Sequence, residues 1–277
     1  MSDVAYDPAH HYDRVTQAWT LLLGEELHYG VFETGDEPLD AATQNLTRLM
    51  AGAMTVPSGV TVLDVGCGTG APACMLASQH GARVTGITTS EVGVEASLAR
   101  AASQDLTNMT AFELRDGMDN GFPDASFDRV WVLESSHLMP ARDRLLAECA
   151  RVLKPGGRLA LCDVMLRREM PFLEVRRLRK PLGILRDVFG DARMEQLETY
   201  RALADSSGLI VDRADDLTTA TRPTFARWRA NAENHRNRVV ELFGADSLDR
   251  FVEASIVLEG FWDDGTLGYG LIAARKP

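Results

Sequence analysis

The chain has 277 residues, of which 45% are hydrophobic and 25% are charged. This composition is that of an ordinary globular protein, and it excludes a disordered, collagen-like or disulfide-stapled chain. Forty Asp and Glu against twenty-nine Lys and Arg give a formal net charge of −11. We therefore expect neither a nucleic-acid partner nor binding to an anionic membrane.

The cysteines and the first residues indicate the compartment. The four cysteines form no CxxC pair and no Cys/His cluster at zinc spacing, so neither a disulfide framework nor a structural metal is expected. The first residues are polar and acidic without a signal-peptide core, and no apolar run approaches the ~18 residues of a membrane span. We expect a soluble cytoplasmic protein without a metal, acting as a monomer or homodimer.

Residues 1–54 are expected to form an N-terminal helical lid. Helical patterns run from about Tyr12 to Leu23 and from Ala41 to Met54, and the loop HYGVFETGDEPLD joins them. One face of the second pattern is apolar and contains Leu46, Leu49, Met50 and Ala53.

Residues 55–166 alternate short apolar runs with helical patterns, which is typical of a parallel sheet built from βαβ units. The helical pattern ARDRLLAECARVL ends at LKPGG, because Pro155 stops a helix and the two glycines turn the chain. The strand candidates of this region are TVLDV, ARVTGIT, MTAFELR, FDRVWVL and GRLALCDVML.

Residues 167–262 are expected to form a helical substrate cap with one core strand near 208–218, and residues 263–277 the last core strand. The stretches at 167–205 and 223–262 are too long and too polar for plain crossovers. The whole pattern predicts a single α/β fold, Rossmann-like, with a mostly parallel seven-stranded sheet and a helical cap.

The strongest motif is VLDVGCGTG at residues 62–70, in which an apolar strand carrying Asp64 is followed by three glycines. Glycines allow a sharp turn and let a ligand contact the backbone. A carboxylate at Asp64 repels phosphate and attracts an ammonium or sulfonium group. The next strand ends in GITTS, without the acidic residue that binds the ribose of NAD. The motif therefore favours a cationic ligand over a dinucleotide.

Three segments, VLDVGCGTG, RDGMDNGFPDASFDRVWVLES and RVLKPGGRLALCD, occur in order along the chain. With them the chain resembles the class I S-adenosylmethionine (SAM)-dependent methyltransferases. LHYGVFE, LESSHLMP and the GYGLIAARKP ending are similar to bacterial natural-product methyltransferases of the rebeccamycin sugar O-methyltransferase type. The resemblance covers nearly the whole chain. It implies the Rossmann-like methyltransferase fold, SAM as cofactor, S-adenosylhomocysteine as product and a small-molecule substrate.

The resemblance also implies roles at the matching positions. Hydroxyls stand where the family commonly has an acidic ribose ligand, and they bind ribose less firmly. The cofactor-binding residues would be Asp64, Gly66, Gly68 and Gly70 at the methionine moiety, Thr88 and Ser90 at the ribose, Asp116, Gly117 and Met118 at the adenine, Leu133 beside the sulfonium, and Tyr29 closing over the methionine end.

Methylation of a hydroxyl requires a base, and a His side chain with a pKa near ~6.5 suits this task. His137 follows a predicted strand at the edge where open α/β sheets bind ligands, and Asp163 could orient it or share the role. The resemblance implies a second His after the first, where this chain has Leu138. We expect O-methylation of a natural product, with His137 as base and Asp163 assisting.

Leu138 leaves alternatives open. Methylation of an isoprenoid or other electron-rich carbon would use aromatic faces to stabilise a cation, with Glu134 or a His removing a proton. A SAM-bound cyclase that transfers no methyl group, as in the related spinosyn cyclase, is another alternative. An NAD-dependent oxidoreductase is disfavoured by Asp64 and GITTS.

The substrate pocket is expected to draw on residues of the lid and cap. The run LRREMPFLEVRRLRKPLGILRD holds seven basic residues in an acidic chain. These residues either pair with local carboxylates on a solvated helix or bind a carboxylate or diphosphate of the substrate. The predicted substrate-binding residues are Trp19, His28, Phe172, Arg176 and Trp262.

Overall fold

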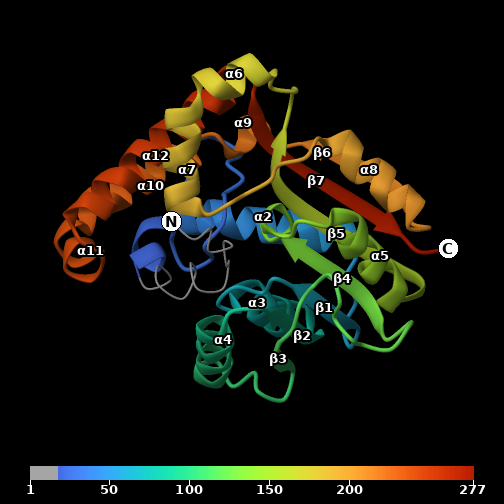
Figure 1. Cartoon of the computed structure of the whole chain (residues 1–277). Helices are drawn as coiled ribbons and strands as arrows, with labels where there is room; N and C mark the ends of the chain where they lie inside the picture. The colour runs from blue at the N-terminus through green and yellow to red at the C-terminus, as the bar shows by residue number, and fades with distance from the viewer. Residues whose placement is uncertain (1–17) are drawn as a thin grey trace, which may run out of the picture.

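The computed structural model describes residues 18–277 (Figure 1). The helix expected from Tyr12 therefore begins outside the described residues, and residues 18–23 are helical. The second predicted lid helix is α2 (Leu39–Met54), which begins two residues earlier than expected, directly after Pro38.

In the described chain, one sheet contains seven strands in the order β3-β2-β1-β4-β5-β7-β6. All neighbouring strands run parallel except at β7, which is antiparallel to both β5 and β6. The predicted mostly parallel seven-stranded sheet is confirmed. The strands are β1 (Thr61–Val65), β2 (Arg83–Thr88), β3 (Thr110–Leu114), β4 (Phe127–Leu133), β5 (Leu153–Leu166), β6 (Ile210–Asp216) and β7 (Leu267–Arg275).

Helices cover both faces of the sheet, because successive strand residues point to opposite sides. Leu63 and Val65 of β1 pack in the same core as α5 and α8, whereas Val62 packs in the core that contains α2 and α3. The sheet is therefore buried on both sides. The flanking helices besides α2 are α3 (Ala71–His80), α4 (Glu91–Ser103), α5 (Arg142–Val152) and α8 (Leu197–Ser206).

The cap helices gather beside one end of the sheet (Figure 1). The helix α12 packs against α7, α10 and α11. Among the residues described, no helix has the length and apolarity needed to cross a bilayer. The cap helices are α6 (Phe172–Arg177), α7 (Arg179–Phe189), α9 (Thr218–Thr221), α10 (Thr224–Asn234), α11 (Arg236–Phe243) and α12 (Ala245–Asp263).

The cap differs from its predicted extent of 167–262 at α8. This helix packs on α5, β6 and β7, and its Tyr200 and Ala204 are 1% exposed within the core of the sheet. The polar sequence of α8 concealed this role, because only a narrow apolar stripe faces the sheet. The chain thus leaves the sheet for the cap twice, once on each side of α8 and β6.

An aromatic cluster joins the lid, the cap and the sheet. The ring of Tyr29 stacks on Trp262 of α12 with centroids 5.3 Å apart and contacts Trp228 of α10 at 4.8 Å. It also lies 5.3 Å from the ring of Tyr269 on β7. Aromatic pairs of this kind contribute about 0.5–1.5 kcal/mol beyond their burial. The lid and cap are consequently parts of one packed fold.

Candidate active site

A cavity of about 1200 Å³ opens at the carboxyl ends of β1, β2 and β4, beneath α7. A typical small-molecule site has ~300–1,000 Å³. This cavity therefore has room for two molecules together, as a group-transfer reaction needs. Its position is the one expected from the topology of open α/β sheets.

The three glycines of the β1–α3 turn have different functions. Gly66 has φ +80°, and a Cβ on it would lie 2.2 Å from the Cβ of Ser135, so the turn approaches the loop after β4 closely. Gly68 has φ +55°, and a Cβ there would meet no atom within 4 Å, since this residue lines the open cavity. Gly70 does not line the cavity; a Cβ on it would lie 2.8 Å from Ser97 of α4. Gly70 thus packs against α4 and is not on the cavity wall, where its predicted cofactor contact would place it.

Asp64 lies on the cavity wall although it is only 2% exposed. Its Oδ2 has no hydrogen-bond partner among the described residues. Burial raises the pKa of Asp64 to about 7. A buried carboxylate without a partner is costly, and a cation placed beside it would remove that cost. The geometry therefore supports the cationic ligand that the sequence favours.

The predicted ribose and adenine positions both lie on the cavity. Ser90 begins α4, where its Oγ accepts a hydrogen bond of 2.9 Å from the N–H of Gly93. Thr88, at the end of β2, accepts a 3.2 Å bond from the N–H of Ser90. Asp116 accepts a 2.8 Å bond from the N–H of Met118, which shapes the loop after β3. Between them Gly117 leaves no space for a Cβ, since Val65 would be 2.6 Å away.

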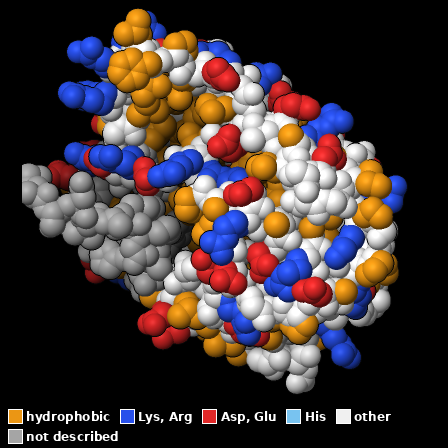
Figure 2. All heavy atoms as spheres, turned by 45° about the vertical axis from the view of Figure 1, so that its right-hand side comes forward, with side chains coloured by type: hydrophobic (Ala, Val, Ile, Leu, Met, Phe, Trp, Pro, Cys, Tyr) orange, Lys and Arg blue, Asp and Glu red, His pale blue; other side chains and the backbone are white. Residues whose placement is uncertain are grey.

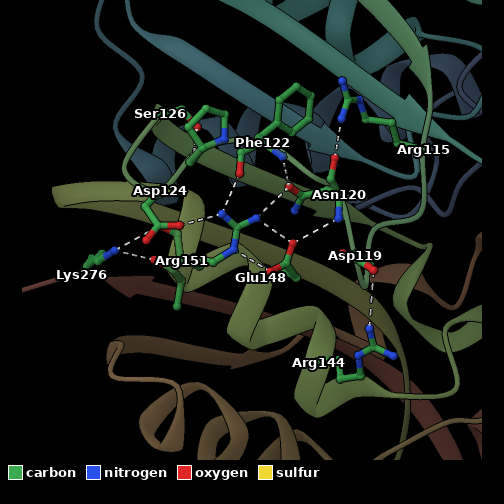
Figure 3. A network of polar contacts seen from close by, with 12 residues as sticks. Arg115, Asp119, Asn120, Phe122, Asp124, Ser126, Arg144, Glu148, Arg151 and Lys276 are labelled. Carbon is green, nitrogen blue, oxygen red and sulfur yellow. Dashed lines mark hydrogen bonds and ion pairs between the residues drawn. The ribbon is translucent and has the colours of Figure 1, made fainter.

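A polar network holds the continuation of this loop against α5 (Figure 3). Arg151 donates a 2.6 Å bond to the carbonyl oxygen of Phe122 and another to Oε1 of Glu148. Glu148 in turn accepts a bond from the N–H of Asn120, whose carbonyl oxygen accepts from Arg115 at 2.7 Å. The network orders the segment directly after the predicted adenine contacts.

His137 and Asp163 form a dyad, although they lie 26 residues apart in the chain. His137 belongs to the short helix η1 (Ser136–Leu138) after β4, and Asp163 to the neighbouring strand β5. The His137 Nδ1 lies 2.6 Å from Oδ1 of Asp163, and the backbone N–H of His137 donates to Oδ2 at 2.9 Å. In the described chain Nε2 of His137 has no hydrogen-bond partner, and the side chain lines the cavity.

The electrostatics of the dyad stabilise the positively charged form that the His137 ring takes when it accepts a proton. Burial lowers the pKa of His137, but the charge and hydrogen bond of Asp163 outweigh this and leave the pKa above its ordinary value. Burial raises the pKa of the fully buried Asp163, yet His137 and the Ser136 hydroxyl hold it below its ordinary value. Asp163 therefore fixes the tautomer and orientation of the ring, with Nε2 as the proton acceptor.

Glu134 also lines the cavity, but its Oε1 is engaged by the protein. It accepts a 2.8 Å bond from the N–H of Tyr29 and a 2.6 Å bond from the hydroxyl of Tyr269. Burial raises the pKa of Glu134, against the charge of His28 and the two hydrogen bonds. Glu134 thus ties the lid to β7.

Replacing Tyr269 by Phe is expected to lower the free energy of unfolding by about 1–2 kcal/mol, because the buried Glu134 then loses one donor. Urea denaturation followed by circular dichroism measures this change. A double-mutant cycle with Glu134→Ala separates the hydrogen bond from the loss of packing. An unchanged unfolding midpoint in Tyr269→Phe would contradict this anchoring role.

Three predicted substrate-binding residues do not line the cavity. Phe172 is 77% exposed at the start of α6, and Arg176 of the same short helix is also exposed. Trp262 lies behind Tyr29, and its indole N–H donates to Thr221. The cavity does receive the other predicted residues, which are Trp19, His28, Tyr29, Leu133, Thr88, Ser90, Asp116, Gly117 and Met118.

One wall of the cavity is formed by α7 and the loop after it. The sequence singled out the basic run that contains most of α7, but not which of its residues face the cavity. Arg179, Leu182, Arg186 and Phe189 line the cavity at helical spacings of three and four. This spacing predicts that the four residues share one face of a helix, but it does not predict that this face lines the cavity. Arg193 follows in the loop, and its backbone N–H donates a 2.8 Å hydrogen bond to the carbonyl oxygen of His137. Residues 18–277 contain no group of three His, Cys, Asp or Glu arranged to hold a metal.

Comparison with known proteins agrees with this geometry. A family model described as a methyltransferase domain matches residues 63–161. The 27-O-demethylrifamycin SV methyltransferase of Amycolatopsis mediterranei (strain S699) is 36% identical over 271 residues, or 96% of this chain and 95% of that protein. The chain belongs to the class I SAM-dependent small-molecule methyltransferases.

Two further proteins resemble this methyltransferase along most of its length. The methyltransferase GfsG of Streptomyces halstedii is 34% identical over 227 residues, which cover 77% of this chain and 76% of that one. The crystal structure of the [4+2]-cyclase SpnF has a TM-score of 0.82 at 30% identity, covering 97% of this chain and 95% of that one.

S-adenosylmethionine is the cofactor of this methyltransferase, and the residues present fit it. The unpartnered carboxylate of Asp64 suits a cation, and the open space at Gly68 lets a ligand approach the backbone of the turn. The polar groups at Thr88 and Asp116 suit a ribose and a base.

The affinity for SAM is expected to fall about tenfold or more from about pH 7.5 to about pH 5.5, since Asp64 then takes up a proton and no longer attracts a cation. The sign follows from the pKa of Asp64, about 7 without a ligand, which a bound cation lowers. Isothermal titration calorimetry at several pH values measures the effect. Asp64→Asn should bind weakly with a much flatter pH profile; a wild-type dependence in Asp64→Asn would assign the proton to another group.

Proposed function

We propose that this methyltransferase transfers a methyl group to a hydroxyl oxygen of a natural product with a large apolar body. The observation that carries the proposal is the dyad, in which Asp163 holds Nδ1 of His137 and leaves Nε2 accessible on the cavity wall. An imidazole held in this way is a suitable base for a hydroxyl proton at neutral pH.

The candidate site residues would have different roles in this reaction. When bound, SAM supplies an electrophilic methyl group on a sulfonium. Asp64 and the turn at Gly68 would hold its charged end, and Nε2 of His137 takes the proton from the acceptor hydroxyl. Asp163 then stabilises the imidazolium, as a buried carboxylate does in other His dyads. The apolar wall, including Leu182 and Phe189, excludes water and helps to align the reactants.

The similarity to the enzyme named for 27-O-demethylrifamycin SV supports oxygen as the methylated atom. The cavity, larger than one ligand requires, supports an acceptor bound beside the cofactor. The net charge of −11 and the four buried free cysteines support a cytoplasmic enzyme without nucleic-acid or membrane partners.

A second candidate function is cyclisation in a SAM-bound cavity without methyl transfer. The likeness to the [4+2]-cyclase SpnF over 97% of the chain favours it, as does Leu138 beside His137. In that case the cavity would supply enclosure and a fixed orientation, which accelerate a reaction within one molecule.

Turnover with SAM carrying a ¹³C-labelled methyl group distinguishes these functions. Hydroxylated natural products are screened for mass gain, and the product is examined by NMR. The proposal requires a methoxy carbon signal and one S-adenosylhomocysteine per product. A labelled methyl on carbon would establish carbon methylation instead, and product without S-adenosylhomocysteine would establish the cyclase.

A further inference from the structure

Three arginines stand at the rim of the cavity. Arg179 and Arg186 lie seven residues apart on α7, hence on one face of the helix, and Arg193 follows in the next loop. All three side chains line the cavity and are also solvent-exposed. We call them the rim arginines. In the upper part of Figure 2, basic side chains lie beside exposed hydrophobic ones.

The rim arginines are not paired with the carboxylates of their own segment. Within residues 18–277, none of their guanidinium groups makes a hydrogen bond or ion pair. By contrast, Arg168 donates two 2.8 Å bonds to Glu174, and Arg250 lies 2.5 Å from Asp187 of α7. Local pairing on a solvated helix therefore accounts for Arg168 but not for the rim arginines. The rim arginines differ from Arg176 and Lys180 of the same run, which have no partner among the described residues either, in that they line the cavity.

The carboxylates of the cavity do not neutralise the rim. Glu26 lies 3.1 Å from Nε2 of the buried His28, and Glu134 accepts its bonds from Tyr29 and Tyr269. Asp64 and Asp116 stand at the predicted cofactor contacts. Asp191 alone among the lining carboxylates accompanies the rim arginines. The cap end of the cavity thus carries excess positive charge in a chain whose net charge is −11.

Apolar side chains lie between the rim arginines and the interior. Leu182 is placed between Arg179 and Arg186 on the same face of α7, and Phe189 follows one turn later. The position of Arg193 next to the dyad is fixed by its backbone bond to His137. A ligand held at the rim by its charge would lay its apolar part along α7 and reach toward His137.

We infer that the acceptor carries an anionic oxygen group, a carboxylate or a phosphate, that binds the rim arginines while its apolar body fills the cavity. Guanidinium groups bind both anions through paired N–H donors, which fixes orientation as well as position. The inference deepens the proposed function, since it assumes that the acceptor occupies the cap end of the same cavity.

Binding of simple amphiphiles to the complex with S-adenosylhomocysteine tests the inference. The probes are decanoate, decyl phosphate and decanol, titrated by calorimetry. We expect both anions to bind about tenfold more tightly than decanol, as charge-assisted bonds at an exposed rim allow. Added salt should reduce this preference.

The variant Arg179→Ala/Arg186→Ala should lose the preference for the anions and keep its affinity for decanol. The matched control is Arg176→Ala/Lys180→Ala, which removes the same charge from exposed residues of the same segment that do not line the cavity. The control should retain the wild-type preference.

Equal affinity for decanoate and decanol, binding of none of the probes, or loss of the preference in the control would each overturn the inference. The assay involves no methyl transfer, so a carbon-methylated product or a cyclised one in the labelling experiment would leave its result unchanged. Conversely, failure of the arginine variants to alter binding would leave the assignment of the dyad intact.

Discussion

Replacing His137 by Ala is expected to lower kcat by about 10²–10⁴-fold, the usual contribution of a general base. The affinity for SAM should stay within about twofold, because no cofactor contact is assigned to this ring. The loss follows from the geometry of the dyad, in which Nε2 of His137 is the accessible proton acceptor and Asp163 is fully buried behind it. Single-turnover kinetics with calorimetry on the same sample measure both quantities.

The dependence of kcat/KM on pH is a second test of the role of His137. Asp163 raises the pKa of His137, and only the neutral ring accepts a proton, so wild-type kcat/KM should fall as the pH drops through this raised pKa. The residual activity of His137→Ala should lack that step. His235→Ala, a change at an exposed histidine outside the cavity, is the control and should behave as wild type. Normal turnover by His137→Ala would disprove the base assignment.

Replacing Gly68 by Val is expected to weaken SAM binding about hundredfold or more, equivalent to about 3 kcal/mol. A Cβ at this position meets no protein atom within 4 Å and projects into the cavity. The valine therefore occupies cofactor space without disturbing the core. Its φ of +55° also costs about 1–2 kcal/mol of stability, as a left-handed conformation does for any side chain.

Gly156→Val separates the two effects. Gly156 has φ +74°, and a Cβ on it would also meet nothing within 4 Å, yet it lies at the start of β5 and does not line the cavity. We expect a similar loss of stability with unchanged SAM affinity. Should Gly68→Val bind SAM as wild type does, the turn would not be the cofactor cradle. Gly66→Val is less informative, because its Cβ would collide with Ser135 and the variant would misfold.

The sheet and the predicted cofactor-binding end of the cavity could be predicted because the sequence patterns that indicate them are short and continuous. A buried strand, Asp64, the glycine turn and a helix follow one another within VLDVGCGTG and the residues just after it, so sequence order reproduces spatial order. The same holds for Thr88 and Asp116, each placed near the end of its own strand. Gly70 marks the limit of this reasoning, since the motif did not distinguish a glycine that faces ligand from one that packs on α4.

His137 and Asp163 were predicted to act together, and the neighbouring strands β4 and β5 bring them together. Parallel pairing aligns Leu133 with Cys162, so the residues that come directly after these two lie at the same edge of the pair. The role of Glu134 was not predictable in this way. Its anchoring bonds come from Tyr29 and Tyr269, which are 105 and 135 residues away in the chain.

The sequence alone therefore determined the fold and predicted the candidate cofactor site and His137 as candidate base, because short chain segments with fixed backbone geometry form them. Only the tertiary structure decided which cap residues line the cavity. It turned Arg179 and Arg186 toward the cavity and left Phe172 and Arg176 outside, although all four lie in one basic, apolar run. The physical reason is that α7 packs on α12, and this distant contact sets which face of the helix remains for a ligand.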